Sequence, residues 1–247
     1  MWFIRLSVTS CFVAVLLLCS SVCAEVEFPT LADKPTPLYE VENFGNPLGA
    51  TPATGIRGLH KAALGLIKTF EGWFADLYND PAGYCTIGYG HLLAKRLCQA
   101  SDRGTYPRAL TPAEGLSLLE KDTAGTRMDV QALVTATTLT DEQFGALTSF
   151  VFNVGRGNFQ NSTMLRRLND TSIPQSTRIE LAAREFSRWI RANGQVMGGL
   201  IARRNCEAAL FQNLNVTDSA GNFNRDACDS LGAMPPAGET IDIVTGE

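Results

Sequence analysis

Two carboxylic acids and a hydroxyl group stand close together in the sequence. Asp80 follows Glu71 by nine positions, and Thr86 follows Asp80 by six. Glycoside hydrolysis needs such a pair of acids: one donates a proton to the leaving oxygen, and the other, ionised, acts on water or on the sugar. On spacing alone, ordinary surface acids in a turn remain the simpler interpretation.

Other chemistries lack the residues that they need. The chain has two histidines, His60 and His91, and contains no HExxH, GxSxG, P-loop or GxGxxG motif. Its cysteines after residue 24 have no paired CxxC spacing, which argues against a zinc site. We therefore expect no metal and no cofactor, and carboxylate chemistry remains.

The first acid lies where a helix is expected to end. Apolar residues recur at helical spacing before it, namely Leu59, Ala63, Leu66, Ile67 and Phe70. Gly72 is a natural C-terminal stop, which places Glu71 at the helix end. The negative end of the helix dipole favours the protonated form of a carboxyl group there. Glu71 is therefore the better candidate for the proton donor.

The second acid and the threonine belong to a predicted hairpin. Residues 73–78 and 84–89 are β-prone, and the turn-forming residues 79–83 separate them. Asp80 would lie in the turn and Thr86 on the returning strand. A helix end facing this hairpin would form one wall of a cleft.

The rest of the chain is predicted to be helical almost to its end. Thr111–Glu114 and Thr140–Gln143 match the capping box that begins many helices. Further helices are expected over residues 164–168, 179–190 and 200–211. The predicted class is α+β, with a small β-hairpin lobe, a larger helical lobe and a cleft between them.

The ends of the chain differ from this domain in composition. Residues 1–24 read as a secretory signal peptide, with a lipoprotein cleavage before Cys19 as the alternative, so we expect a secreted protein. Residues 25–55 form a Pro-rich acidic extension, 56–212 the domain, and 213–247 an acidic tail. Neither end shows a sustained apolar period, and we interpret both as extensions or linkers.

Four cysteines follow the signal segment, and an even number in an exported chain predicts two disulfides. Among three possible connectivities, the nearest-neighbour pairing is Cys85 with Cys98 and Cys206 with Cys228. Three N-glycosylation sequons begin at Asn161, Asn169 and Asn215. Arginines gather in the C-terminal part of the domain; they either pair internally or form a basic surface that the acidic ends screen.

The amino-acid sequence around the two acids resembles that of a known family. Phe70-Glu71-Gly72 and the stretch from Tyr78 to His91 closely resemble the phage-type lysozymes of glycoside hydrolase family 24. Residues 146–155 and 199–211 resemble the same family. The resemblance covers essentially the whole domain and implies a lysozyme-like fold and a muramidase that cleaves bacterial peptidoglycan. The cysteines, the signal and the two ends lie outside the phage pattern.

The resemblance implies a role for each matching residue. Glu71 would be the general acid, while Asp80 and Thr86 would hold and activate the attacking water and invert the anomeric centre. Arg203 or Arg204 would pair with Glu71 in the free enzyme. Cys85 precedes Thr86 directly, so a disulfide beside the site leaves the role of Thr86 more open than that of Glu71.

Further residues are implied around this centre. His91 would be structural and would pair with Asp122. The saccharide groove would be lined by Leu92, Phe152, Asn153 and Ser162, although Leu92 and Phe152 fit the core of a lobe equally well. The expected partner is peptidoglycan, bound by a monomer without nucleic acid or membrane. The rivals are a lytic transglycosylase, which would need neither Asp80 nor Thr86, and a non-catalytic peptidoglycan-binding protein.

Overall fold

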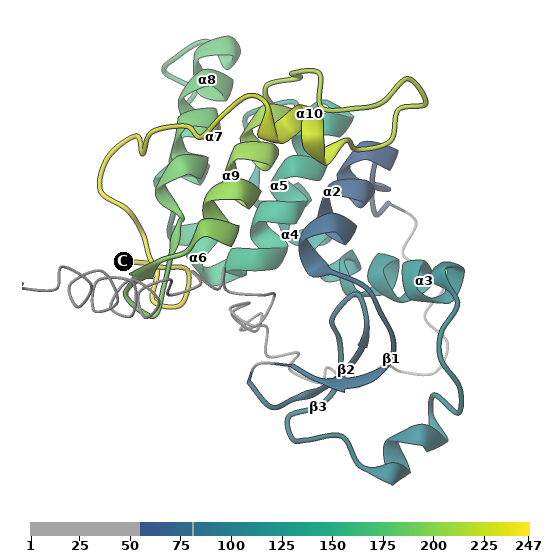
Figure 1. Ribbon diagram of the computed structural model, residues 1–247. Coiled ribbons are helices and arrows are strands. Elements are labelled where there is room, and N and C mark those ends of the chain that lie inside the picture. Colours follow the sequence, from purple (N-terminus) through teal and green to yellow (C-terminus); the bar gives the residue numbers. More distant parts are fainter. Residues whose placement is uncertain (1–54, 81) are drawn as a thin grey trace, which may run out of the picture. The chain divides into compact units, whose positions relative to one another are not determined.

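The computed structural model describes residues 55–80 and 82–247. The expected signal peptide and nearly all of the Pro-rich extension lie outside the described residues. Within the described part, a small sheet lies beside α2 (Lys61–Glu71) and α3 (Pro112–Asp122), and α2 also packs with later helices in a helical group (Figure 1). The predicted α+β class is confirmed.

The first described helix, α2, spans Lys61–Glu71 and ends where the sequence predicts. Gly72 has a φ of 73°, and its backbone N–H donates to the carbonyl of Lys68. This left-handed conformation suits glycine, which has no Cβ to clash. Leu66 and Ile67 face the core and are fully buried, so the helix is fixed in rotation and presents its last residue inward.

The sheet has one more strand than the predicted hairpin. β1 (Phe74–Asn79), β2 (Cys85–Gly88) and β3 (His91–Ala94) are antiparallel, in that order. Tyr78 lies opposite Thr86, and Thr86 lies opposite Leu92. Because residues directly opposite each other share a face of the sheet, these three side chains form one row across it. A short 3₁₀ helix, η2 (Ala100–Gly104), follows.

Capping chemistry sets the next helices. α3 (Pro112–Asp122) begins after Thr111, whose hydroxyl accepts from the N–H of Glu114. α4 (Ala124–Leu133) follows it, and α5 (Asp141–Val154) begins after Thr140 with the same reciprocal pattern. Both predicted capping boxes are confirmed.

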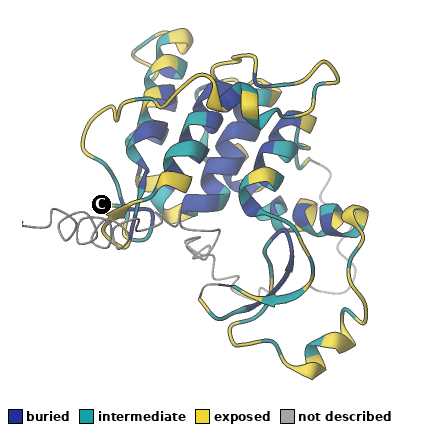
Figure 2. Cartoon of the chain, in the orientation of Figure 1, coloured by how far each residue is buried: buried dark blue, intermediate teal, exposed yellow. Residues whose placement is uncertain are grey.

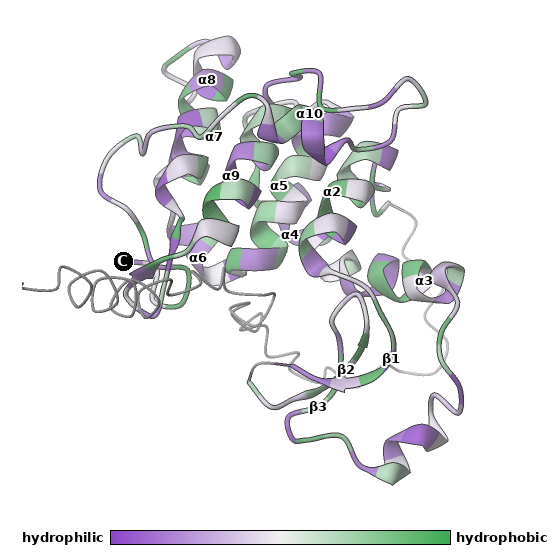
Figure 3. Cartoon of the chain, viewed as in Figure 1, coloured by the Kyte–Doolittle hydropathy of each residue, from purple (hydrophilic) through white to green (hydrophobic). Residues whose placement is uncertain are grey.

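The helical group packs around α5 and the last long helix, α9 (Gly198–Phe211). α5 is buried along most of its length (Figure 2), and apolar residues predominate on it (Figure 3). A helix that is buried on nearly all sides belongs in a core, and the buried polar residues of α5 need partners there. Around these two helices lie α6 (Arg156–Asn161), α7 (Thr163–Leu168), α8 (Gln175–Glu185) and the 3₁₀ helix η3 (Phe186–Arg188).

The helix expected over residues 179–190 begins earlier and ends earlier than predicted, because α8 spans Gln175–Glu185 and η3 follows it. After η3, the chain forms a hairpin of β4 (Arg191–Ala192) and β5 (Gln195–Val196). Asn193 and Gly194, with φ of 50° and 79°, form its turn. Asn-Gly is a strong signal for such a hairpin, because both residues tolerate positive φ.

Residues 213–247, interpreted from the sequence as an acidic extension or linker, pack against the domain in the structure. Val216, Cys228 and Ile243 are buried in the main core, and α10 (Arg225–Asp229) packs against α9. The chain then returns to the β4 hairpin, where Asp242 bridges to Arg191. This segment is acidic but structural.

Several arginines of the C-terminal region pair with acids inside the domain. Ion pairs join Arg156 to Asp129, Arg184 to Glu180 and Arg188 to Glu185. Their charge is therefore partly neutralised locally. None of the helices in the described ranges is long and apolar enough to span a membrane.

Candidate active site

Glu71 is the last residue of α2, and its side chain is almost completely buried at 2% exposure. The Nη1 atom of Arg203 lies 2.8 Å from its Oε1 atom. Of the two arginines implied by the family resemblance, Arg203 therefore makes the contact. The pair joins α2 to α9 across the helical group.

Arg203 is held on three sides. Its Nε atom lies 3.0 Å from Oε1 of Glu207, and its Nη2 atom donates to the carbonyl of Ser149 at 3.0 Å. Burial alone would lower the pKa of Arg203, but the negative charges of Glu71 and Glu207 raise it above its ordinary value. The guanidinium stays charged.

Arg204 points away from Glu71. Its Nε atom forms an ion pair with Oε2 of Glu207 at 3.0 Å, and its Nη2 atom donates to Oδ1 of Asn153 at 2.8 Å. The guanidinium lies over the ring of Phe150, 4.8 Å from the centroid. Burial lowers the pKa of Arg204 to about 10, and Glu207 opposes that shift.

Asp80 is fixed by the turn between β1 and β2. Its Oδ1 atom accepts from the backbone N–H of Tyr84 at 2.8 Å, and its own N–H donates to the carbonyl of Tyr84 at 2.9 Å. Gly83 closes the turn by donating to the carbonyl of Asp80 at 2.8 Å. The carboxylate is half-buried and held in one orientation.

Thr86 is buried at the centre of the sheet. Its hydroxyl lies 3.1 Å from the carbonyl of Tyr84 and 3.3 Å from that of Tyr78. These contacts leave the oxygen lone pairs of the hydroxyl as acceptors.

Tyr78 connects the three residues that the sequence singles out. Burial raises its pKa, a hydrogen bond with the Thr86 side chain lowers it, and the charges of Asp80 and Glu71 raise it. Its ring stacks on Phe74, with centroids 4.0 Å apart. The charges of Glu71 and Asp80 therefore both act on the Tyr78 hydroxyl group, which also contacts the Thr86 side chain.

The disulfides have the nearest-neighbour pairing. Cys85 is bonded to Cys98 with a Cα–Cα distance of 4.6 Å, and Cys206 to Cys228 with 5.4 Å. The first bond lies next to Thr86 and fastens β2 to the segment after β3. The side-chain oxygen of Asn79 accepts from the N–H of Cys98 at 2.7 Å and anchors the same segment to β1.

His91 and Asp122 lie in contact, as the resemblance implies. The Nδ1 atom of His91 is 2.9 Å and 3.0 Å from the two carboxylate oxygens of Asp122. Since His91 begins β3 and Asp122 ends α3, the pair ties the sheet to a helix.

The four expected groove residues have different environments. Leu92 is 40% exposed on the row that contains Thr86, whereas Phe152 is half-buried against a small cluster around Ile67. Asn153 is buried, and its side-chain oxygen accepts from Arg204. The hydroxyl of Ser162 accepts from the N–H of Leu165 and caps α7. The structure thus leaves Leu92 most open to a ligand.

Tyr78, Ser149 and Glu207 were not among the site residues predicted from the sequence. A signal exists for two of them. Antiparallel pairing about a turn centred near residue 82 places residue 78 opposite residue 86. Glu207 follows Arg203 by four positions, the spacing at which opposite charges meet on a helix. Nothing in the sequence indicates Ser149, which reaches Arg203 from another helix.

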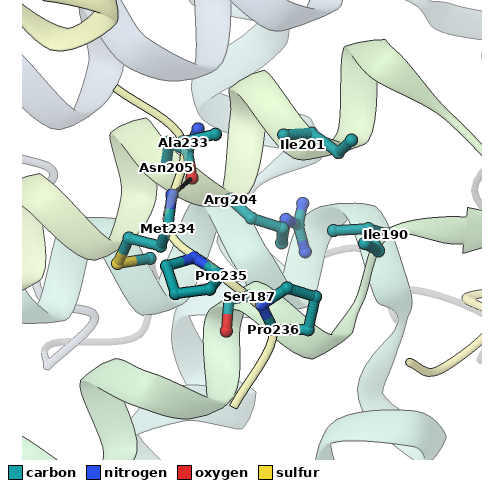
Figure 4. A pocket seen from close by; sticks show the side chains of 9 residues that line it. All are labelled: Ser187, Ile190, Ile201, Arg204, Asn205, Ala233, Met234, Pro235 and Pro236. Carbon is teal, nitrogen blue, oxygen red and sulfur yellow. Dashed lines mark hydrogen bonds between the residues drawn. The ribbon is translucent and has the colours of Figure 1, made fainter. Parts of the chain in front are cut away.

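A pocket of about 360 Å³ lies elsewhere, beneath the C-terminal segment (Figure 4). Met234, Pro235 and Pro236 cover it, and side chains of η3 and α9 form its floor. Arg204 lines it, but Glu71, Asp80 and Thr86 do not. The pocket is therefore separate from the candidate catalytic residues.

Comparisons with known proteins agree with the resemblance. A sequence model described as phage lysozyme matches residues 68–207. An endolysin of Bacillus phage PZA is 37% identical over 161 residues, which cover 62% of this chain and 54% of the endolysin. An endolysin of Acyrthosiphon pisum secondary endosymbiont phage 1 is 32% identical, with 62% of this chain and 97% of the endolysin covered. The chain spans little more than half the length of the two Bacillus phage endolysins that it matches.

Solved structures show the same fold. The muramidase domain of SpmX from Asticaccaulis excentricus has a TM-score of 0.51 and 36% identity, covering 63% of this chain and 98% of that domain. A variant of phage P22 lysozyme has a TM-score of 0.52 and 27% identity, covering 63% and 99%. The α+β fold is thus lysozyme-like. With more than half of its residues matched by the family model, the chain belongs to the phage lysozyme family.

Proposed function

We propose that this protein is a secreted muramidase that hydrolyses the β-1,4 bond between N-acetylmuramic acid and N-acetylglucosamine in bacterial peptidoglycan. One arrangement carries the proposal. Glu71, buried at the end of α2, pairs with Arg203, and Tyr78 hydrogen-bonds Thr86 while the charges of Glu71 and Asp80 both act on its hydroxyl group. The related endolysins and the muramidase domain support the substrate class.

Glu71 acts as the general acid in this proposal. Its carboxyl group donates a proton to the glycosidic oxygen, so that the sugar leaves as a neutral alcohol. Burial and the helix end favour the protonated form, while Arg203 favours the ionised form. The carboxyl group is therefore poised between two opposing influences.

Asp80 and Thr86 act on the water. The Thr86 hydroxyl accepts a hydrogen bond from it, and the Asp80 carboxylate takes its proton as the oxygen attacks the anomeric carbon from the face opposite the leaving group. Attack from that face inverts the configuration. Tyr78 and the Cys85–Cys98 disulfide keep the threonine in position.

Leu92, Phe152, Asn153 and Ser162 belong to the proposed saccharide groove. Leu92 offers an exposed apolar contact beside Thr86. Asn153 and Ser162 contribute mainly by holding α5 and α7 in place, because their side-chain oxygens are engaged within the protein. We propose that a monomer suffices, without metal, cofactor, nucleic acid or membrane.

Export through the signal segment would fit the two disulfides, and exported chains of some hosts carry N-glycans. Among the sequons, Asn161 and Asn215 are exposed. The Asn169 side-chain nitrogen, the atom that would carry a glycan, donates to the carbonyl of Leu133 at 2.8 Å, and its oxygen accepts from Thr135, so a glycan there would disturb a contact within the protein. Glycopeptide mapping of the secreted protein should find glycans at Asn161 or Asn215; a glycan at Asn169 would contradict this assignment.

Analysis of the products tests the proposed function. Purified peptidoglycan is digested with the protein, and the released fragments are examined by mass spectrometry. Reducing N-acetylmuramic acid ends support hydrolysis. Anhydromuramyl ends would assign a lytic transglycosylase instead, and the absence of fragments would leave a binding protein. In a separate reading, NMR of the first product formed would reveal the α-anomer if the reaction inverts.

A further inference from the structure

Four charged side chains alternate in sign through the helical group. Glu71, Arg203, Glu207 and Arg204 are each at most 3% exposed. Two of them are negative and two are positive, so the buried row is neutral as a whole. Buried charges persist only where partners compensate for the lost water.

Glu207 is the centre of this row. Its Oε1 atom accepts from Ser149 Oγ at 2.6 Å and from Arg203 Nε at 3.0 Å, and its Oε2 atom lies 3.0 Å from Arg204 Nε. Ser149 in turn binds the third nitrogen of Arg203 through its carbonyl. The guanidinium of Arg203 is therefore fixed in plane, and Nη1 is the nitrogen presented to Glu71.

We propose that Glu207 is a positioning residue that sets the upper pH limit of activity by orienting Arg203 and by offsetting its charge at Glu71. The proposal rests on the proposed function, in which Glu71 must carry a proton at the start of each reaction cycle. A guanidinium beside a carboxylate favours loss of that proton. The negative charge of Glu207 on the far side of Arg203 opposes this effect.

The other charged groups around Glu71 come from three elements. Tyr78 of β1 feels the charges of both Glu71 and Asp80, and Lys68 precedes Glu71 by one turn on α2. Arg225 of α10 lies over the ring of the adjacent Phe70 at 4.6 Å and pairs with Asp229. The Glu207 and Arg204 variants leave all of these residues unsubstituted. A difference in pH dependence between these variants therefore comes from the charges of the buried row.

The test is the pH dependence of peptidoglycan hydrolysis in three variants of the full chain. Glu207→Gln removes a negative charge, and we expect the basic limb of the profile to move down by about one pH unit, the size of a charge effect at this range in protein. Arg204→Gln removes a positive charge and should move the limb up. The double variant restores neutrality, and its limb should lie near that of the wild type.

Opposite shifts separate this role from a purely structural one, which would lower activity or thermal stability without moving the limb. If Glu207→Gln does not fold, two variants still test the proposal. Arg204→Gln should move the basic limb of the pH profile up, and the charge-balanced double variant should bring it back to the wild-type position. The proposal is overturned if the limb stays in place in every folded variant. Failure of the proposed function is recognised separately: the wild type would then not hydrolyse peptidoglycan, or Glu71→Gln would hydrolyse it as fast as the wild type.

Discussion

The Nη1 atom of Arg203 lies 2.8 Å from Oε1 of Glu71, and both side chains are almost completely buried. This contact links the end of α2 to the middle of α9. A buried ion pair of this kind is strongly destabilising to break, since the remaining charge has lost both its partner and its water.

Arg203→Gln is therefore expected to destabilise the fold by about 3–5 kcal/mol, measured as the free energy of unfolding in urea. Arg184→Gln is the matched control, because Arg184 and Glu180 form an exposed pair at helical spacing, with side chains 63% and 62% exposed. Its cost should be about 0.5 kcal/mol or less. Equal costs for the two variants would show that the buried pair has no special weight.

Tyr78→Phe keeps the ring that stacks on Phe74 and removes the hydroxyl that contacts Thr86. We expect roughly tenfold slower hydrolysis, the loss of one hydrogen bond of ordinary strength, with little change in melting temperature. Tyr106→Phe, on the segment before α3, is the control and should leave the rate unchanged. Wild-type rates for Tyr78→Phe would remove Tyr78 from the site.

Acid should weaken the start of α3. Hydrogen bonds from Arg108 and from Thr111 hold the pKa of Glu114 at about 2, below its ordinary value. Since the folded-state pKa is the lower one, the stabilisation is present above the unfolded value and is lost as pH falls through about 2. Melting temperatures measured from pH 6 to pH 2 should fall less steeply for Glu114→Gln than for the wild type. Parallel curves would exclude this contribution.

Close packing of α2 on α5 depends on a glycine. A Cβ atom at Gly145 would lie 2.1 Å from the Cβ atom of Ala63, so Gly145→Ala must push α2 and its terminal Glu71 outward. We expect a loss of about 1–3 kcal/mol, as for overpacking in other cores. Gly157→Ala, which has open space in α6, should be neutral or slightly stabilising. A neutral Gly145→Ala would mean that the helices separate without cost.

Local chemistry in the sequence predicts much of this fold. Capping residues mark the starts of α3 and α5, and Gly72 marks the end of α2, because these signals act through the backbone of a few adjacent residues. The Asn193-Gly194 turn carries a comparable signal, but it lies between the helices expected over residues 179–190 and 200–211, where the sequence analysis placed no strands.

Features that depend on distant contacts were not predictable in the same way. β3 pairs with β2 only after the chain reverses through Gly90, and residues 213–247 lack a helical period because they pack as irregular chain, tied to α9 by Cys228. The choice of Arg203 over Arg204 depends on the rotation of α9 against α5. Adjacent residues on a helix point about 100° apart, and tertiary packing decides which one faces Glu71.

Hydrolysis of peptidoglycan by Glu71→Gln, measured beside the wild type and the exposed-surface control Glu120→Gln, tests the central claim most directly. Glutamine is nearly isosteric but has no proton to donate, so the rate should fall by about 10²-fold or more while the circular dichroism spectrum stays native. Glu120→Gln should match the wild type. Near-wild-type hydrolysis by a folded Glu71→Gln would contradict the assignment of Glu71 as the general acid.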